Sequence, residues 1–140
     1  MAKGPSPHLT WAELACKDGT AYPSEWMTTR AVPLAQEFEA IRHAVGGKPV
    51  AVLSAYRTPA HNATVGGARH SQHLQGRALD LRPPKGMSVD RFHRVIREVA
   101  DQSASRIRGI GRYPSGVHID LRPSDRLVHW TRGTRRRADA

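Results

Sequence analysis

The stretch that decides the fold of this 140-residue chain is SQHLQGRALD, residues 71–80. From residue 77 to residue 82 apolar and polar side chains alternate, which predicts a β-strand. Leu79 and Leu81 point to one face of that strand and Asp80 points to the other. One face of the strand is therefore expected in the core, and the other is available for chemistry.

A second alternating segment, VHIDL at residues 117–121, repeats this arrangement. If both strands share one core, His118 and Asp120 lie on the same face as Asp80, and His73 comes just before that strand. Two imidazoles and a carboxylate on one open face make a three-ligand site with a position left for water, the arrangement of catalytic zinc. Iron, cobalt and nickel accept the same donors, and a hydrogen-bonded His–Asp pair without metal is the structural alternative.

Outward from these strands the chain alternates helical and extended patterns. A Thr-x-x-Glu capping box predicts a short helix from Thr10, apolar residues at helical spacing predict a helix from Pro33 to Val45, and Ser88 caps another. Further strands are expected at residues 49–55, 106–113 and 116–122, the last two as a hairpin. We predict a single α+β domain at residues 10–123, with a small, mainly antiparallel sheet flanked by helices, after a disordered N-terminus (1–9) and before a basic tail (124–140).

Composition excludes some classes of protein and favours others. No apolar run approaches the ~18 residues of a membrane span, and the single cysteine, Cys16, excludes an internal disulfide. No secretory signal is visible, so we expect synthesis in the cytoplasm. The net charge of +10 favours polyanionic partners. Specific nucleic-acid binding is not expected, because no zinc finger or alternating aromatic–basic motif is present.

Five segments together resemble a known family. They are SAYRTPAHN (54–62), GGA (66–68), the decapeptide at 71–80, GIGRYP (109–114) and VHID (117–120). In this order they are similar to the D-alanyl-D-alanine carboxypeptidase family of zinc peptidases, whose fold is shared by lysostaphin-type enzymes and the hedgehog signalling domain. The resemblance implies this hedgehog/DD-peptidase fold and hydrolysis of a peptide bond in peptidoglycan.

The resemblance also implies roles for individual residues. Zinc (Zn2+) would be held by His73, Asp80 and His118. Arg57 would bind a carboxylate or carbonyl of the substrate peptide, because its planar fork pairs with carboxylate through two bonds. Ser71 and Gln72 would either bind substrate or orient the neighbouring imidazole.

The sequence departs from the family near the third ligand. Some relatives carry a catalytic Glu three residues before the last histidine ligand, or a His two before it; here these positions are Ser115 and Gly116. Asp120 remains as a candidate, either as the general base or as the group that fixes the tautomer of His118.

Two functional hypotheses follow. The first is a peptidoglycan hydrolase of phage or prophage origin, reaching the bacterial cell wall by holin release or as part of a virion. The second, favoured by the departure near the third ligand, is a non-catalytic virion or wall-binding module that keeps the peptidase fold. In either case peptidoglycan is the expected partner, with phage particle components as further candidates.

Overall fold

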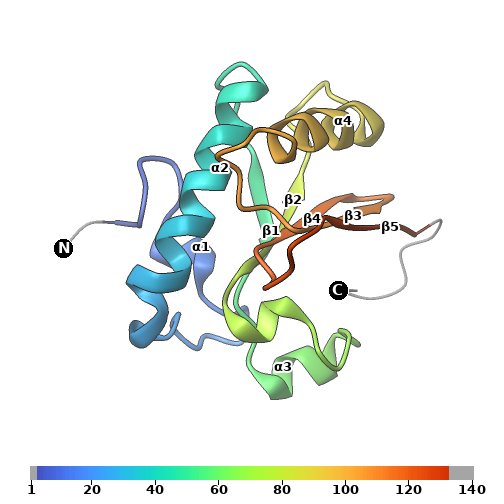
Figure 1. Ribbon diagram of the computed structural model, residues 1–140. Helices are drawn as coiled ribbons and strands as arrows, with labels where there is room; N and C mark the ends of the chain where they lie inside the picture. The colour runs from blue at the N-terminus through green and yellow to red at the C-terminus, as the bar shows by residue number, and fades with distance from the viewer. Residues whose placement is uncertain (1–2, 133–140) are drawn as a thin grey trace.

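The computed structural model describes residues 3–132, and in that part of the chain helices flank one five-stranded sheet (Figure 1). The α-helices are α1 (Trp11–Leu14), α2 (Val32–Ala44), α3 (Pro59–Thr64) and α4 (Val89–Ala100). Short 3-10 or π-helical turns are η1 (Ser24–Trp26), η2 (Met27–Ala31) and η3 (Gln72–Gln75). The strands are β1 (Ala51–Ser54), β2 (Ala78–Arg82), β3 (Gly109–Tyr113), β4 (Gly116–Asp120) and β5 (Val128–Thr131).

The sheet has the strand order β1-β2-β4-β3-β5. β2 lies antiparallel between β1 and β4, β3 and β4 form an antiparallel hairpin, and only β5 runs parallel to its neighbour, β3. The predicted α+β domain with a mainly antiparallel sheet is confirmed. Among the described residues, every helix is too short or too polar to cross a lipid bilayer.

Local sequence signals set where the helices begin. Thr10 accepts a hydrogen bond from the backbone of Glu13, whose carboxylate accepts one from the backbone of Thr10, so the predicted capping box forms. The hydroxyls of Thr58 and Ser88 cap α3 and α4 in the same position. These caps fix the ends of the segments that lead into the sheet.

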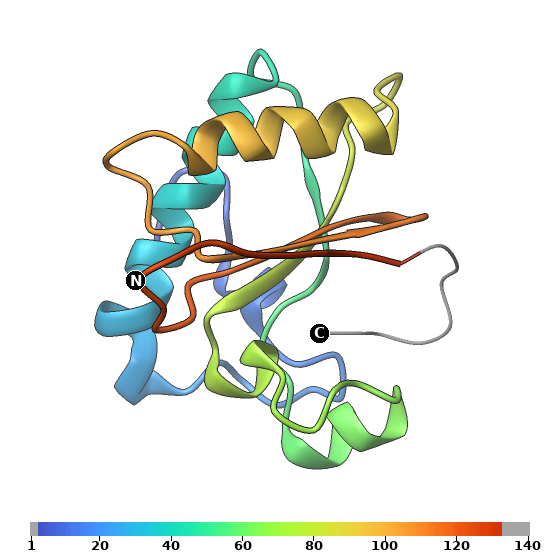
Figure 2. The ribbon, with the colours of Figure 1, turned by 45° about the vertical axis from the view of Figure 1, so that its right-hand side comes forward.

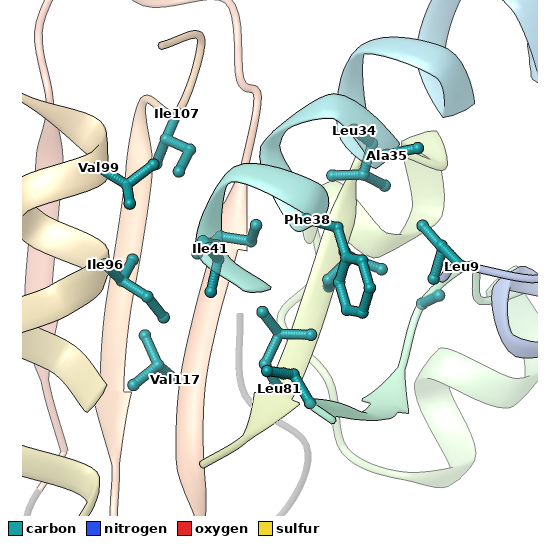
Figure 3. Packing of buried hydrophobic residues seen from close by; sticks show 14 of the residues in the cluster. Leu9, Leu34, Ala35, Phe38, Ile41, Leu81, Ile96, Val99, Ile107 and Val117 are labelled. Atoms are coloured by element: carbon teal, nitrogen blue, oxygen red, sulfur yellow. The ribbon is translucent and has the colours of Figure 1, made fainter. Parts of the chain in front are cut away.

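The hydrophobic core lies between the sheet and the pair α2 and α4, and α3 lies on the other side of the sheet (Figure 2). Figure 3 shows Phe38 of α2 beside Leu81 of β2, and Ile96 of α4 beside Val117 of β4. All four side chains are at most 1% exposed, and burying each contributes about 1.5–3 kcal/mol. This packing fixes the face of the sheet that β2 and β4 present to the helices.

The alternation of β2 and β4 leaves their polar residues on the face away from this core. Leu79 pairs with Ile119 in the register and both are in the core cluster. Asp80 pairs with His118, one position along, so these two side chains share the opposite face. The sheet therefore has the predicted core face, with Leu79 and Ile119, and the predicted polar face, with Asp80 and His118.

Both ends of the described part of the chain differ from the prediction. The sheet continues beyond residue 123, because β5 hydrogen-bonds to β3. Before residue 10, Leu9 is fully buried and the Ser6 hydroxyl donates to Glu39 at 2.6 Å, so this segment packs on α2 rather than being disordered. Residues 1–2 and residues 133–140 of the predicted tail lie outside the described residues.

Candidate metal centre

Strands β2 and β4 and the turn η3 bring three predicted ligands together. Asp80 and His118 are direct partners in the antiparallel register. His73 lies in η3, where the Ser71 hydroxyl accepts a hydrogen bond from its backbone N–H at 3.2 Å. The turn ends at Gly76, whose φ of 68° is a left-handed conformation that suits glycine. The chain can therefore reverse at Gly76, three residues after His73, and enter β2 at Ala78.

The three side chains meet at one carboxylate oxygen. Asp80 Oδ1 lies 3.1 Å from His73 Nε2 and 2.9 Å from His118 Nδ1. One ligand atom from each residue lies within 4.8 Å of the other two. Both histidine side chains are buried and the side chain of Asp80 is 20% exposed, so the cluster opens to solvent on the Asp80 side.

The hydrogen bonds behind each imidazole fix its tautomer. His73 Nδ1 lies 2.6 Å from the backbone oxygen of Ala55, which can only accept, so Nδ1 carries the proton. His118 Nε2 lies 2.7 Å from Asp120 Oδ2, so its N–H donates to that carboxylate. Each ring therefore turns its other nitrogen toward Asp80 Oδ1.

The charges of the cluster favour a bound cation. Burial lowers the pKa of His73 and keeps its imidazole neutral. Burial alone would raise the pKa of Asp80, yet the imidazoles of His73 and His118 hold it well below its usual range. Burial also lowers the pKa of His118, but hydrogen bonds to Asp120 and Asp80 outweigh burial and raise it. A neutral nitrogen and an ionised oxygen are both acceptors, so they approach to about 3 Å only around a proton or a metal ion.

The spacing of these donors fits a metal ion. Ligand atoms about 2.0–2.1 Å from a tetrahedral ion lie about 3.3 Å from one another, close to the 3.1 and 2.9 Å that separate Asp80 Oδ1 from the two nitrogens. Imidazole and carboxylate are ligands that zinc accepts, and cobalt, nickel or iron use the same donors. His73, Asp80 and His118 could therefore hold one divalent cation and leave a coordination position open.

Asp120 lies behind His118, on the side away from Asp80. It is fully buried, and Arg122 donates to both of its oxygens at 2.8 and 2.7 Å. Because burial is outweighed by these bonds and by His118, the pKa of Asp120 is held well below its usual range. Asp120 is not among the described residues that line the cleft in front of the cluster. This geometry favours the tautomer-fixing role over the general-base role.

Two glycines of β3 leave space for Asp120 and Trp130, two side chains that contact His118. The sequence did not predict this role for the glycines. A Cβ at Gly109 would collide with the carboxylate of Asp120, and one at Gly111 would collide with the indole of Trp130. The Trp130 ring lies 5.3 Å from the ring of His118. The Gly-x-Gly spacing was the available signal, but the strand that carries Trp130 was not expected.

A cleft of about 450 Å³ opens in front of the cluster. Asp80, His118 and Arg57 lie on its wall, together with the uncharged side chains of Tyr113 and Ser115. Arg57 is 1% exposed; its guanidinium donates to Ser54, Asn62 and Asp80 Oδ2, each at 3.1 Å. This fork therefore directs Asp80 Oδ1 toward the imidazoles while one side of Arg57 lines the cleft.

Ser71 and Gln72 are not among the described residues that line the cleft. Ser71 is buried and caps the turn of His73. Gln72 accepts a hydrogen bond from Arg77 Nε at 2.7 Å. Of the two roles expected for these residues, orientation of the His73 turn agrees with these contacts.

A second group of possible ligands, Cys16, Asp18 and His61, was not anticipated. One ligand atom from each lies within 4.8 Å of the others. The Asp18 carboxylate accepts hydrogen bonds from the backbone of Thr20 at 2.9 Å and the hydroxyl of Thr58 at 2.8 Å, which hold its pKa well below its usual range. These bonds tie the loop after α1 to the start of α3, and His61 reaches from there to the wall of the cleft.

Comparison with known proteins agrees with this geometry. The chain is 44% identical over 78 residues to the zinc D-Ala-D-Ala carboxypeptidase of Streptomyces albus G. The aligned part is 56% of this chain and 29% of that protein, so the chain spans less than a third of the relative's length. A sequence model of the peptidase M15 family matches residues 7–120, which include all three candidate ligands. The chain therefore belongs to the peptidase M15 family.

Proposed function

We propose that the chain is a zinc-dependent peptidase that hydrolyses a peptide bond in the stem peptides or cross-links of bacterial peptidoglycan. The observation that carries the proposal is the convergence of His73 Nε2, Asp80 Oδ1 and His118 Nδ1, of which Asp80 and His118 line an open cleft while His73 is buried behind them. The activity named for the relative from Streptomyces albus G supports the choice of zinc and of the wall peptide.

The residues present give metal binding and substrate contact in such a reaction a physical basis. A zinc ion at this site would supply a Lewis acid for the scissile carbonyl and would lower the pKa of a bound water to about 7. His73 provides a neutral nitrogen donor, His118 provides a second one when its Nδ1 is deprotonated, and Asp80 provides the negative charge. Arg57 is the proposed contact for a carboxylate or carbonyl of the peptide, because it lies on the cleft wall and its partners hold the guanidinium in place.

Asp120 is assigned to positioning rather than to direct proton transfer. Its carboxylate holds the Nε2 proton of His118 and is itself held by Arg122. Carboxylates behind a histidine ligand fix the orientation of the ring and raise its basicity. Asp120 therefore acts on the reaction through His118.

The proposed biological setting is a phage or prophage lysin acting at the bacterial cell wall, released by a holin or carried in the virion. The net charge of +10 supports this setting, since a positive field attracts an anionic wall.

A non-catalytic wall-binding module with the same fold is the second candidate. It is favoured by one observation: among the described residues that line the cleft, Asp80 is the only carboxylate. Ser115 and Gly116, at the positions where some relatives carry Glu or His, also line the cleft and cannot accept a proton usefully at neutral pH.

Digestion of purified peptidoglycan separates the two candidates. The zinc-loaded chain, its Asp80→Asn variant and a control variant, Asp90→Asn, would each be incubated with cell walls, and the released muropeptides identified by mass spectrometry. A peptidase gives a new peptide terminus with wild type and with Asp90→Asn, and none with Asp80→Asn. Tight zinc binding without any cleaved product would support the wall-binding module. Equal zinc content and equal products for wild type and Asp80→Asn would reject the metal centre itself.

A further inference from the structure

A second hollow, of about 360 Å³, lies at the end of the sheet where β2 and β3 begin and β4 ends. We call it the basic hollow, because five arginines and no acidic residue line it in the described part of the chain: Arg30, Arg77, Arg106, Arg108 and Arg122. It shares no lining residue with the cleft of the metal centre. The two hollows are therefore separate sites.

Most of these arginines form no direct ion pair with a carboxylate within residues 3–132. Arg122 is paired with Asp120, which is buried behind it. Arg30, Arg77 and Arg108 donate to backbone or amide oxygens, which carry no net charge. Burial, reinforced by the charge of Arg30 and partly opposed by the charge of Asp120, lowers the pKa of Arg77. Guanidinium groups gathered in this way repel one another, and a bound anion would remove that repulsion.

We propose that the basic hollow binds phosphodiester groups of an anionic polymer that carries no nucleobases. The planar arginine fork matches phosphate oxygens through paired hydrogen bonds, and several forks around one small volume suit a ligand with more than one charge. No aromatic ring is among the described lining residues, so a nucleobase would find no aromatic platform in the hollow. This site does not depend on the proposed peptidase activity, since it requires neither the metal nor the cleft.

Binding of a short oligo(glycerol phosphate) to the full chain tests the proposal. Affinity would be measured by calorimetry at several salt concentrations for wild type, for Arg106→Ala/Arg108→Ala and for Arg91→Ala/Arg94→Ala. The second double variant removes the same charge from the exposed surface of α4 and is the matched control. We expect the first to weaken binding roughly tenfold or more and to reduce the salt slope by about one to two, and the control to change binding by less than about threefold.

Three results would overturn the proposal. Equal losses in the two double variants would mean that the charge of the whole molecule attracts the polymer and that no site exists. Equal binding of a poly(glutamate) of the same charge would remove the preference for phosphate, and tighter binding of a single-stranded oligonucleotide would favour a nucleic acid. Should the first double variant unfold, Arg106→Ala alone replaces it, because Arg106 is exposed and can be changed without disturbing the core.

Discussion

Replacing Asp120 by asparagine distinguishes the two roles that the sequence allows for this residue. Asparagine keeps the size of the side chain but exchanges one acceptor oxygen for a donor NH2 group. Asp120 accepts bonds from His118 Nε2 at 2.7 Å and from the backbone and guanidinium of Arg122 at 3.1, 2.8 and 2.7 Å. An amide cannot satisfy all of these donors, so either His118 or Arg122 loses its partner.

The size of the effect follows from these bonds. A hydrogen bond to a charged group contributes about 1.5–3 kcal/mol. Because the Arg122 side chain is 25% exposed and solvent screens part of the interaction, we expect the free energy of unfolding to fall by about 1–3 kcal/mol. Loss of the group behind a histidine ligand weakens metal binding by about 10- to 100-fold, or about 1.4–2.7 kcal/mol.

Metal affinity and turnover are to be measured separately for this variant. Competition with a chromophoric chelator gives the affinity for zinc or cobalt, and urea unfolding gives the stability. Asp90→Asn is the control, because Asp90 is 67% exposed and pairs with Arg112 at the surface. A variant that binds metal as tightly as wild type but has lost turnover would refute the positioning role and restore Asp120 as the proton acceptor.

Three further predictions concern the same framework. We expect metal affinity to fall as the pH falls through the raised pKa of His118, because a protonated imidazole cannot bind a metal ion. The fall should begin above the ordinary histidine pKa of about 6.5. Affinity measured by chelator competition that stayed constant down to about pH 5 would contradict this. Gly109→Ala lowers the free energy of unfolding in urea by about 1–3 kcal/mol and weakens metal binding, because the added methyl group displaces Asp120. An unchanged urea midpoint would show that this contact is not rigid. Phe38→Ala lowers the free energy of unfolding by about 3–5 kcal/mol in the same assay, since Phe38 on α2 is only 1% exposed. A decrease below about 1 kcal/mol would contradict the core described above.

The sheet and its chemical face could be predicted because the signals there are local. Alternation in residues 77–82 and 117–121 assigns Asp80 and His118 to one face whichever neighbours the strands have. The capping box at Thr10 likewise needs only four residues. The β3–β4 hairpin was predicted in the same way, but the full order of the strands was not.

Features that depend on contacts distant in sequence could not be predicted. β5 is a four-residue strand whose place in the sheet comes from pairing with β3; its residues alternate apolar and polar, but four residues do not specify which strand they pair with. The salt bridge from Arg57 to Asp80 and the place of Asp120 behind His118 depend on side-chain direction, which alternation alone does not give. The gathering of arginines in the basic hollow similarly requires three strand ends to meet.

Anomalous X-ray diffraction at the zinc absorption edge, from crystals grown with zinc, tests the metal centre most directly. We expect one anomalous peak that lies about 2.0–2.2 Å from each of His73 Nε2, Asp80 Oδ1 and His118 Nδ1. A map without a peak there, or one whose only peak lies among Cys16, Asp18 and His61, would contradict it.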